Sequence, residues 1–136
     1  MSTRKRNSFE HTDLAKELTL VLHNKASCYE FKVYLQTRHC EENIYFWLDV
    51  EAYQDPLVTP TKQLNEKAQQ LYDKYFSDNS EYQLNLDSDL VFEVLNRIKT
   101  GQINRLTFNN AQKAIFKVME TDCIGKFCEQ NRGMIT

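Results

Sequence analysis

The sequence contains very few residues that interrupt helices. Its 136 residues include 3 glycines and 2 prolines, well below ordinary usage, and no low-complexity tract. Scarce helix breakers combined with long periodic apolar segments favour an all-α protein. A chain of this length corresponds to one domain that buries most of its apolar surface in one core.

Other absences exclude several classes of function. No apolar run approaches the ~20 residues that cross a bilayer, and no signal-peptide pattern opens the chain. The formal net charge of −2 offers no excess of positive charge, so we expect no nucleic-acid partner. The 4 cysteines form no Cys-x-x-Cys pair, the 3 histidines complete no zinc spacing, and no glycine-rich phosphate loop is present. We therefore expect free thiols, no metal and no cofactor in a soluble cytoplasmic protein.

Apolar periodicity predicts where the helices lie. A helical face begins at Leu14, and a second short segment places Cys28 and Leu35 on one side. Residues 41–54 carry apolar side chains on two faces, so this helix is predicted to be buried on most sides and to form the centre of the fold. Gly101 is predicted to end a later helix. The predicted N-terminal caps of later helices are Thr59 followed by Pro60, Asp87 or Ser88, and Thr107. A last helix is predicted to start near Thr121 or Asp122.

The two ends of the chain differ from its middle. Residues 1–12 are polar and include Arg4-Lys5-Arg6. We expect a flexible tail there, the alternative being a tether to a membrane or a nucleic acid. A helical domain is predicted over residues 13–131, followed by a C-terminal tail over residues 132–136.

Two short segments combine neutral amides with expected helix starts. Asn43 follows two acidic residues and precedes an apolar block that contains the only tryptophan, Trp47. Asn85 stands beside the start of a later helix. An amide both donates and accepts hydrogen bonds, and neither segment pairs a nucleophile with a base. The two segments therefore indicate a recognition surface more than a catalytic centre.

The same segments resemble those of a known family. The similar segments, in the family's order, are residues 31–35, 41–47, 51–53, 71–76, 85–88, 108–112 and 119–122, followed by Phe127. Over roughly residues 14–130 the chain thus resembles a regulator of G-protein signalling (RGS) domain. The resemblance implies an all-α fold, a bundle of about seven to nine helices in the RGS-domain arrangement.

The resemblance also implies a function. RGS domains bind the switch regions of a heterotrimeric G-protein α subunit (Gα) in its GTP-bound or transition-state form. They stabilise the transition state of GTP hydrolysis and so inhibit signal transduction. The chain would then be no enzyme itself, but a GTPase activator that acts on the intrinsic activity of Gα. We expect a cytoplasmic monomer, recruited to the inner face of the plasma membrane only through its partner.

Nine positions match Gα-binding residues of the family. They are Cys40, Glu42, Asn43, Asn85, Asp87, Ser88, Val118, Asp122 and Lys126. The asparagine that matches Asn43 packs against the switch segments, and the one that matches Asn85 lies near the glutamine that orients the attacking water. The aspartate that matches Asp122 binds a backbone amide and a threonine of the first switch.

Three of these positions depart from the usual family residue. Cys40 replaces a common serine, Val118 a common leucine, and Lys126 a common arginine, whose planar fork a lysine does not reproduce. The departures bear on affinity and on preference among Gα subunits more than on the fold.

Local structure also offers simpler explanations for some of these residues. Glu42 favours the positive end of a helix dipole, and Asn85 is suited to capping a loop. Asp122 and Lys126, four residues apart, are spaced for an ion pair on a helix surface.

Two other functions remain open on the sequence. One is an RGS-homology scaffold that binds a protein partner without accelerating GTP hydrolysis. The three departures favour it slightly, whereas the presence of Asn43, Asn85 and Asp122 argues against it. The other is a thiol-dependent enzyme built on His39 and Cys40, because a cysteine at a helix start can have a lowered pKa. No third orienting residue or oxyanion donor accompanies that pair, and neighbouring acids oppose a thiolate.

Overall fold

The computed structural model of the protein describes the backbone of residues 14–135 and the side chains of residues 14–131. The tail predicted at residues 1–12 lies outside the described residues. Within residues 14–135 the regular secondary structure is helical and contains no strand, which confirms the predicted all-α class. The last helix continues to Ile135, so residues 132–135 of the expected C-terminal tail are helical.

The chain forms two compact units. The first unit comprises Met1–Glu41 and Lys117–Thr136, and the second comprises Glu42–Phe116. In the first unit, residues 14–22 are helical. They are followed by α2 (Lys25–Thr37), the last part of α6 (Asn109–Asp122) and α7 (Ile124–Ile135).

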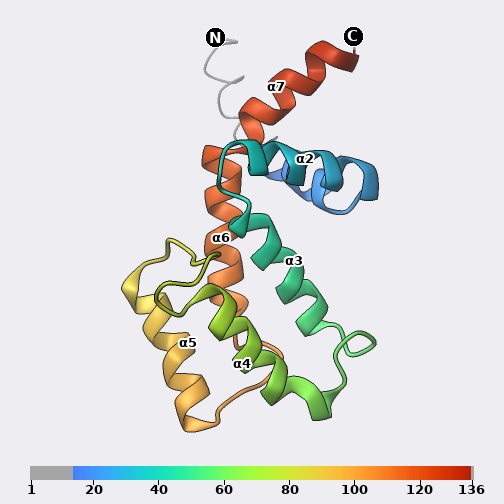
Figure 1. Cartoon of the computed structure of the whole chain (residues 1–136). Helices are drawn as coiled ribbons and strands as arrows, with labels where there is room; N and C mark the ends of the chain where they lie inside the picture. The colour runs from blue at the N-terminus through green and yellow to red at the C-terminus, as the bar shows by residue number, and fades with distance from the viewer. Residues whose placement is uncertain (1–13, 136) are drawn as a thin grey trace, which may run out of the picture. The chain divides into compact units, whose positions relative to one another are not determined.

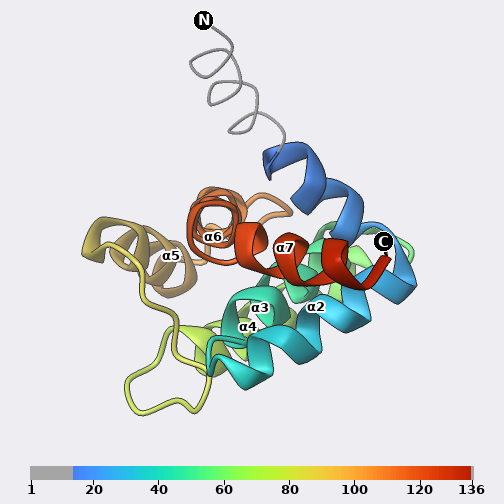
Figure 2. The ribbon, with the colours of Figure 1, turned by 90° about the horizontal axis from the view of Figure 1, so that it is seen from above.

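The core of the first unit lies where α7 packs on α2, and the two helices lie one over the other in Figure 2. The ring of Phe127 on α7 packs 5.0 Å from the ring of Phe31 and 5.5 Å from that of Tyr34, both on α2. Asn24 begins α2 by accepting the Ser27 N–H at 3.1 Å, a normal N-cap. The buried apolar residues of this unit are Leu18, Val21, Leu22, Phe31, Leu35, Met119, Cys123, Ile124 and Phe127.

A Schellman turn ends α2. The Cys40 N–H donates to the Leu35 carbonyl at 3.0 Å, and the His39 N–H donates to the Gln36 carbonyl at 3.2 Å. His39 occupies the position that this motif usually gives to glycine, with φ at 58°. A side chain with a Cβ is strained in this left-handed conformation. The chain therefore enters the next helix through a turn that stores backbone strain.

The second unit is built around α3 (Glu42–Gln54). After α3 come the short 3-10 helix η1 (Thr61–Gln63), α4 (Leu64–Tyr75), α5 (Ser88–Thr100) and the first part of α6. Figure 1 shows α4 between α3 and α5. Ile44, Phe46 and Val50 of α3 are fully buried, which confirms the predicted burial of this helix. Phe46 packs edge-on against the rings of Tyr75 and Phe108.

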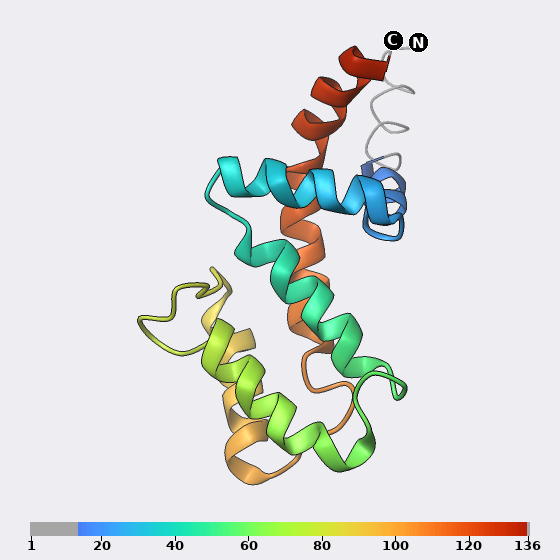
Figure 3. The ribbon, with the colours of Figure 1, turned by 45° about the vertical axis from the view of Figure 1, so that its right-hand side comes forward.

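Hydrogen bonds from one arginine fix the carboxyl end of α3. Arg105 Nη1 donates to the carbonyls of Tyr53 at 3.0 Å and of Thr59 at 2.6 Å. The Tyr53 hydroxyl donates in return to the Asn104 carbonyl at 2.7 Å. We call these four residues the Arg105 clamp. Figure 3 shows the connection between α5 and α6, which carries Arg105, running beside the last turn of α3.

Two predicted helix caps are wrong. The Thr59 hydroxyl donates back to the Ala52 carbonyl at 2.9 Å, and Pro60 takes the N-cap position of η1. The Thr107 hydroxyl donates to the Asn104 carbonyl at 2.8 Å and accepts the Asn104 N–H at 2.9 Å, while α6 begins only at Asn109. Both hydroxyls make their hydrogen bonds to residues that precede them, which orients them away from the helix that follows.

The remaining predicted helix ends give a mixed result. Asp87 takes the N-cap position of α5, although its side chain makes no capping hydrogen bond, and Gly101 ends α5 with φ at 74°. The last helix starts at Ile124, two residues after Asp122, which itself ends α6. The Thr121 hydroxyl donates to the Lys117 carbonyl at 2.9 Å, so this residue stays within α6.

Candidate functional site

The start of α3 presents the first predicted site segment. Glu42 is the first residue of the helix and is half-buried, where its carboxylate favours the positive end of the helix dipole. Asn43 follows with only 7% of its surface exposed. The structure thus places most of the Asn43 side chain inside the unit and leaves a small part of it at the surface.

The loop after α4 presents the second segment. Asn85, Asp87 and Ser88 are exposed, in contrast to Asn43. The residue before them, Leu84, is buried, and its N–H donates to the Tyr75 carbonyl at the end of α4 at 2.9 Å. Asn85 therefore follows directly on a fixed point of the loop.

An aromatic contact ties this loop to α3. The ring of Tyr82 lies 5.4 Å from the ring of Tyr45 in an edge-on arrangement with an interplanar angle of 75°. Tyr45 lies two residues after Asn43, and Tyr82 lies three residues before Asn85. The contact therefore brings the two amide-bearing segments to the same end of the second unit.

A charged group lies beneath the same loop. The Lys74 ammonium lies 5.7 Å from the centre of the Tyr82 ring and 5.1 Å from that of the Tyr75 ring. It also pairs with Asp49 Oδ2 at 3.1 Å, and the Tyr75 hydroxyl donates to the same oxygen at 2.6 Å. Burial, then the hydrogen bond to Asp49 and its negative charge, raise the pKa of Tyr75 far above the usual range. Tyr75 therefore stays a neutral donor at physiological pH.

The other four predicted residues belong to the first unit. Val118 on α6 is half-buried, Asp122 is the exposed last residue of that helix, and Lys126 is exposed on α7. Cys40, half-buried, follows the Schellman turn. Among the described residues no ion pair joins Asp122 to Lys126, because the turn at Cys123 puts them on different helices. The nine predicted residues thus form two sets, one in each unit.

The Schellman turn gives His39 and Cys40 a structural role, so their adjacency needs no catalytic explanation. Both residues reverse the chain through their backbone N–H groups. Where the structure describes the chain, the four cysteines form no disulfide. Burial raises the pKa of the Cys28 thiol, against a smaller lowering by Lys32. Across the described side chains, no three His, Cys, Asp or Glu residues are grouped to hold a metal ion.

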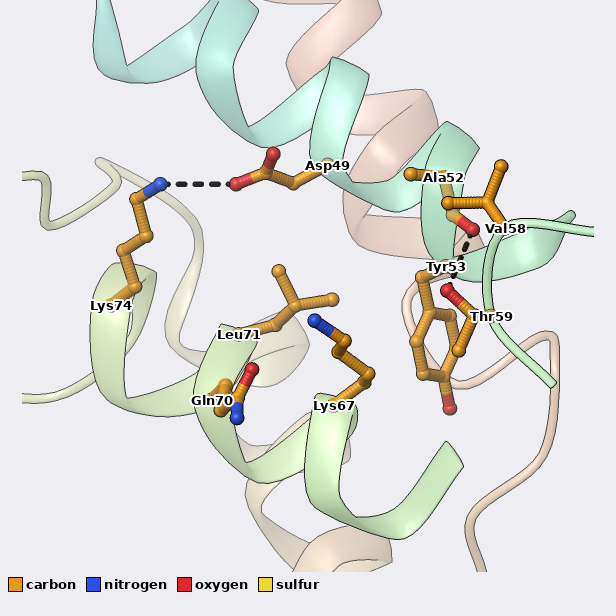
Figure 4. Close-up of a pocket in the computed structure, with 9 residues that line it drawn as sticks. All are labelled: Asp49, Ala52, Tyr53, Val58, Thr59, Lys67, Gln70, Leu71 and Lys74. Carbon is orange, nitrogen blue, oxygen red and sulfur yellow. Dashed lines mark hydrogen bonds and ion pairs between the residues drawn. The ribbon is translucent and has the colours of Figure 1, made fainter. Parts of the chain in front are cut away.

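A cavity of about 240 Å³ lies between α3 and α4 (Figure 4). Its lining residues are Asp49, Ala52, Tyr53, Val58, Thr59, Lys67, Gln70, Leu71 and Lys74. The Asp49–Lys74 ion pair crosses its rim. None of the nine predicted residues lines it, although Lys74 at its rim also approaches the Tyr82 ring of the amide-bearing loop.

Sequence reasoning missed the residues that hold the loop in place. Residues 77–83 are polar apart from Tyr82, and nothing in the sequence gives that residue a role. A large aromatic ring in an otherwise polar stretch was the available signal, because such a ring usually packs against something. Its contact, Tyr45, cannot be identified from sequence spacing.

Among the described residues, no helix has the length and hydropathy that crossing a bilayer requires.

Comparisons with known proteins point to one family. A family model described as "Regulator of G protein signaling domain" matches residues 17–131. Regulator of G-protein signaling 1 of Xenopus laevis is 33% identical over 99 residues, which cover 71% of this chain and 46% of that protein. The mouse protein of the same name is 31% identical over 117 residues, 86% of this chain and 54% of that protein. Regulator of G-protein signaling 8 of Danio rerio is 29% identical over 118 residues, 87% of this chain and 66% of that protein. The chain spans about half the length of the first two relatives.

Proposed function

Because the chain belongs to the regulator of G-protein signalling family, we propose that it binds Gα and accelerates GTP hydrolysis by Gα. The observation that carries this proposal is the exposed Asn85, presented by an anchored loop beside the start of α3. An exposed amide on a fixed backbone suits recognition of a specific protein conformation.

The chemistry belongs to Gα in this proposal. Phosphoryl transfer requires a bound Mg²⁺, an aligned water and stabilisation of the charge that develops in the transition state, and Gα subunits carry the necessary arginine themselves. A partner can therefore accelerate the reaction by binding the mobile switch segments most tightly in their transition-state shape. Each tenfold gain in rate requires about 1.36 kcal/mol of such preferential binding.

The residues of the two sets suit this task. The Asn85 amide is exposed and can donate and accept hydrogen bonds without adding charge near the phosphates. Asp122 offers an exposed carboxylate that can accept backbone N–H groups of Gα. Asn43, mostly buried, can contact a partner only through its small exposed part. We assign Asn85 the larger share of the effect for this reason.

The test is single-turnover GTP hydrolysis by a panel of purified Gα subunits, with and without the protein. Binding to the GDP–aluminium fluoride form of Gα, which mimics the transition state, is measured beside binding to the GDP form. We expect faster hydrolysis and tighter binding to the mimic. Binding without acceleration would instead assign the chain to the scaffold function, and the absence of binding across the panel would contradict a Gα partner.

We extend the proposal to the cellular setting. The protein acts as a cytoplasmic monomer and reaches the inner face of the plasma membrane through Gα. Sedimentation of the purified chain tests the monomeric state, which a dimer would contradict. Imaging with and without overexpressed active Gα tests recruitment to the plasma membrane. Recruitment that does not depend on Gα would contradict the proposal, because it would require a different membrane anchor.

A further inference from the structure

Resting on the function proposed above, we propose that Tyr82 is a positioning residue for Asn85. Its ring packs edge-on against Tyr45 and holds the loop in the conformation that binds Gα. Tyr82 is half-buried and three residues before the exposed Asn85. It therefore acts on the partner through the loop.

The loop has few other apolar groups to order it. Between the end of α4 and Leu84, residues 77–83 are polar apart from Tyr82. Several of the hydrogen bonds in this stretch are local, such as the Gln83 N–H to the Ser80 carbonyl at 3.3 Å. Local bonds of this kind shape a turn but do not attach it to another helix. The Tyr82 ring attaches the loop to α3. Its attachments to α4 are hydrogen bonds, from the Leu84 N–H to the Tyr75 carbonyl and from the Ser80 hydroxyl to the Lys74 carbonyl among them.

The ring of Tyr82 is held from two sides. Tyr45 meets it edge-on, and the Lys74 ammonium lies 5.7 Å from its centre. Lys74 is itself fixed by Asp49 at 3.1 Å. A ring with two fixed neighbours has little rotational freedom left, so the backbone that follows it is ordered before a partner arrives.

Order before binding affects affinity in a defined way. A loop that is mobile in the free protein must be ordered on association, which weakens binding without changing the bound state. Loss of the ring contact should therefore raise the concentration of protein that half-saturates the acceleration and leave the rate at saturation unchanged. Loss of the Asn85 amide, by contrast, should lower the rate at saturation.

The experiment compares Tyr82→Leu, Tyr45→Leu, the double variant and Tyr82→Phe in the full chain. Four quantities are measured for each variant: the half-saturating concentration, the saturated rate of Gα hydrolysis, hydrogen exchange of the Leu84 and Asn85 backbone amides, and the thermal midpoint. We expect each leucine variant to raise the half-saturating concentration and to speed exchange of the Leu84 amide, both by about threefold to tenfold. Tyr82→Phe, which keeps the ring, should match the wild type.

The double variant separates positioning from direct contact. If the two rings act through each other, the double variant should be no worse than either single leucine variant. If Tyr82 touched Gα directly, Tyr45→Leu would leave the half-saturating concentration unchanged, and this outcome overturns the proposal. A fall in thermal midpoint with uniformly faster exchange throughout the unit would also overturn it, since the ring would then serve global stability.

The exchange measurement keeps this inference separate from the proposed function. Suppose that the wild type accelerates no Gα while both leucine variants speed hydrogen exchange only in the loop. The proposed function is then wrong, and the role of Tyr82 as an anchor of the loop is supported. If the wild type is active and exchange of the Leu84 amide stays within about twofold in both leucine variants, the anchor is wrong and the function stands.

Discussion

The two ends of α3 are held in different ways. At its carboxyl end the Arg105 clamp joins two connecting segments, and its polar groups are taken up by backbone partners within the unit. At its amino end the loop that carries Asn85 is attached to α3 through a ring contact and to α4 through hydrogen bonds, and Asn85 itself is exposed. The difference indicates that stability is concentrated at the clamp, whereas the other end keeps polar groups available for a partner.

Removing the clamp should have the largest effect on stability. Arg105→Met leaves the carbonyls of Tyr53 and Thr59 without their donor in a half-buried setting. Since a hydrogen bond from a charged group contributes about 1.5–3 kcal/mol, we expect the free energy of unfolding to fall by about 3 kcal/mol. Urea denaturation measures it. Arg105→Lys should recover less than half, because an ammonium cannot reproduce the planar fork.

The comparison of the two ends also requires that this variant keep its activity. Acceleration of Gα hydrolysis per folded molecule should stay within about twofold of the wild type, a factor worth ~0.4 kcal/mol. A large loss of acceleration in a stable Arg105→Met protein would show that the clamp also serves function. The two ends of α3 would then not differ in role.

The opposite pattern is expected at Asn85. Asn85→Ala removes an exposed amide, so acceleration should fall at least about tenfold, or ~1.4 kcal/mol, with nearly unchanged thermal midpoint. Gln83→Ala is the matched control, since Gln83 is exposed in the same loop and is not among the predicted site residues. Single-turnover hydrolysis and a thermal melt suffice. A collapse in stability with normal activity per folded molecule would assign Asn85 to structure.

Sequence alone went furthest where the signal was repeated along a helix. The two apolar faces of residues 41–54 predicted a buried central helix, and Gly101 predicted a helix end at a left-handed residue. Thr59 and Thr107 misled because a threonine before a helix can bond backward as well as forward. Only the positions of the Ala52 and Asn104 carbonyls decide which of these occurs.

The site was predictable to a smaller extent. The resemblance supplied the nine positions, but the burial of Asn43 and the exposure of Asn85 came only with the structure. Arg105 gave no sequence signal, because the carbonyls it binds belong to residues about fifty positions away. The Asp122–Lys126 pair failed because a four-residue spacing implies a helical face only while the helix continues.

A smaller effect is expected between the two ends, at Tyr75. Its hydroxyl holds Asp49 of α3, while its carbonyl holds the loop through Leu84. Tyr75→Phe removes only the hydroxyl, so we expect a loss of about 1 kcal/mol in the free energy of unfolding and little change in acceleration. Denaturation at pH 7 tests this, and loss of acceleration without loss of stability would contradict it. Tyr53→Phe makes the matched change at the clamp.

The pH dependence of the same variant has a definite sign. Burial, then Asp49, raise the pKa of folded Tyr75, whereas an unfolded tyrosine titrates near pH ~10. Above that pH the unfolded chain releases a proton that the folded chain keeps, so stability is fully present below pH ~10 and declines as pH rises further. The wild type should therefore lose more stability between pH ~9 and ~11 than Tyr75→Phe does. Equal slopes would show that Tyr75 does not contribute.

The smallest effect should come from the strained turn that leads into α3. His39 has φ at 58° in the Schellman turn, so His39→Gly should relieve strain and raise the free energy of unfolding by about 0.5–1 kcal/mol. His39→Ala is the control, because it keeps the Cβ and should give no such gain. Acceleration should remain at the wild-type level in both variants, since the turn acts through its backbone. If His39→Gly gained stability and lost acceleration while His39→Ala lost none, the strain itself would hold the amino end of α3 in its binding conformation. That end would then depend on stored backbone strain as well as on the Tyr82 contact, in contrast to the hydrogen-bonded clamp at the other end.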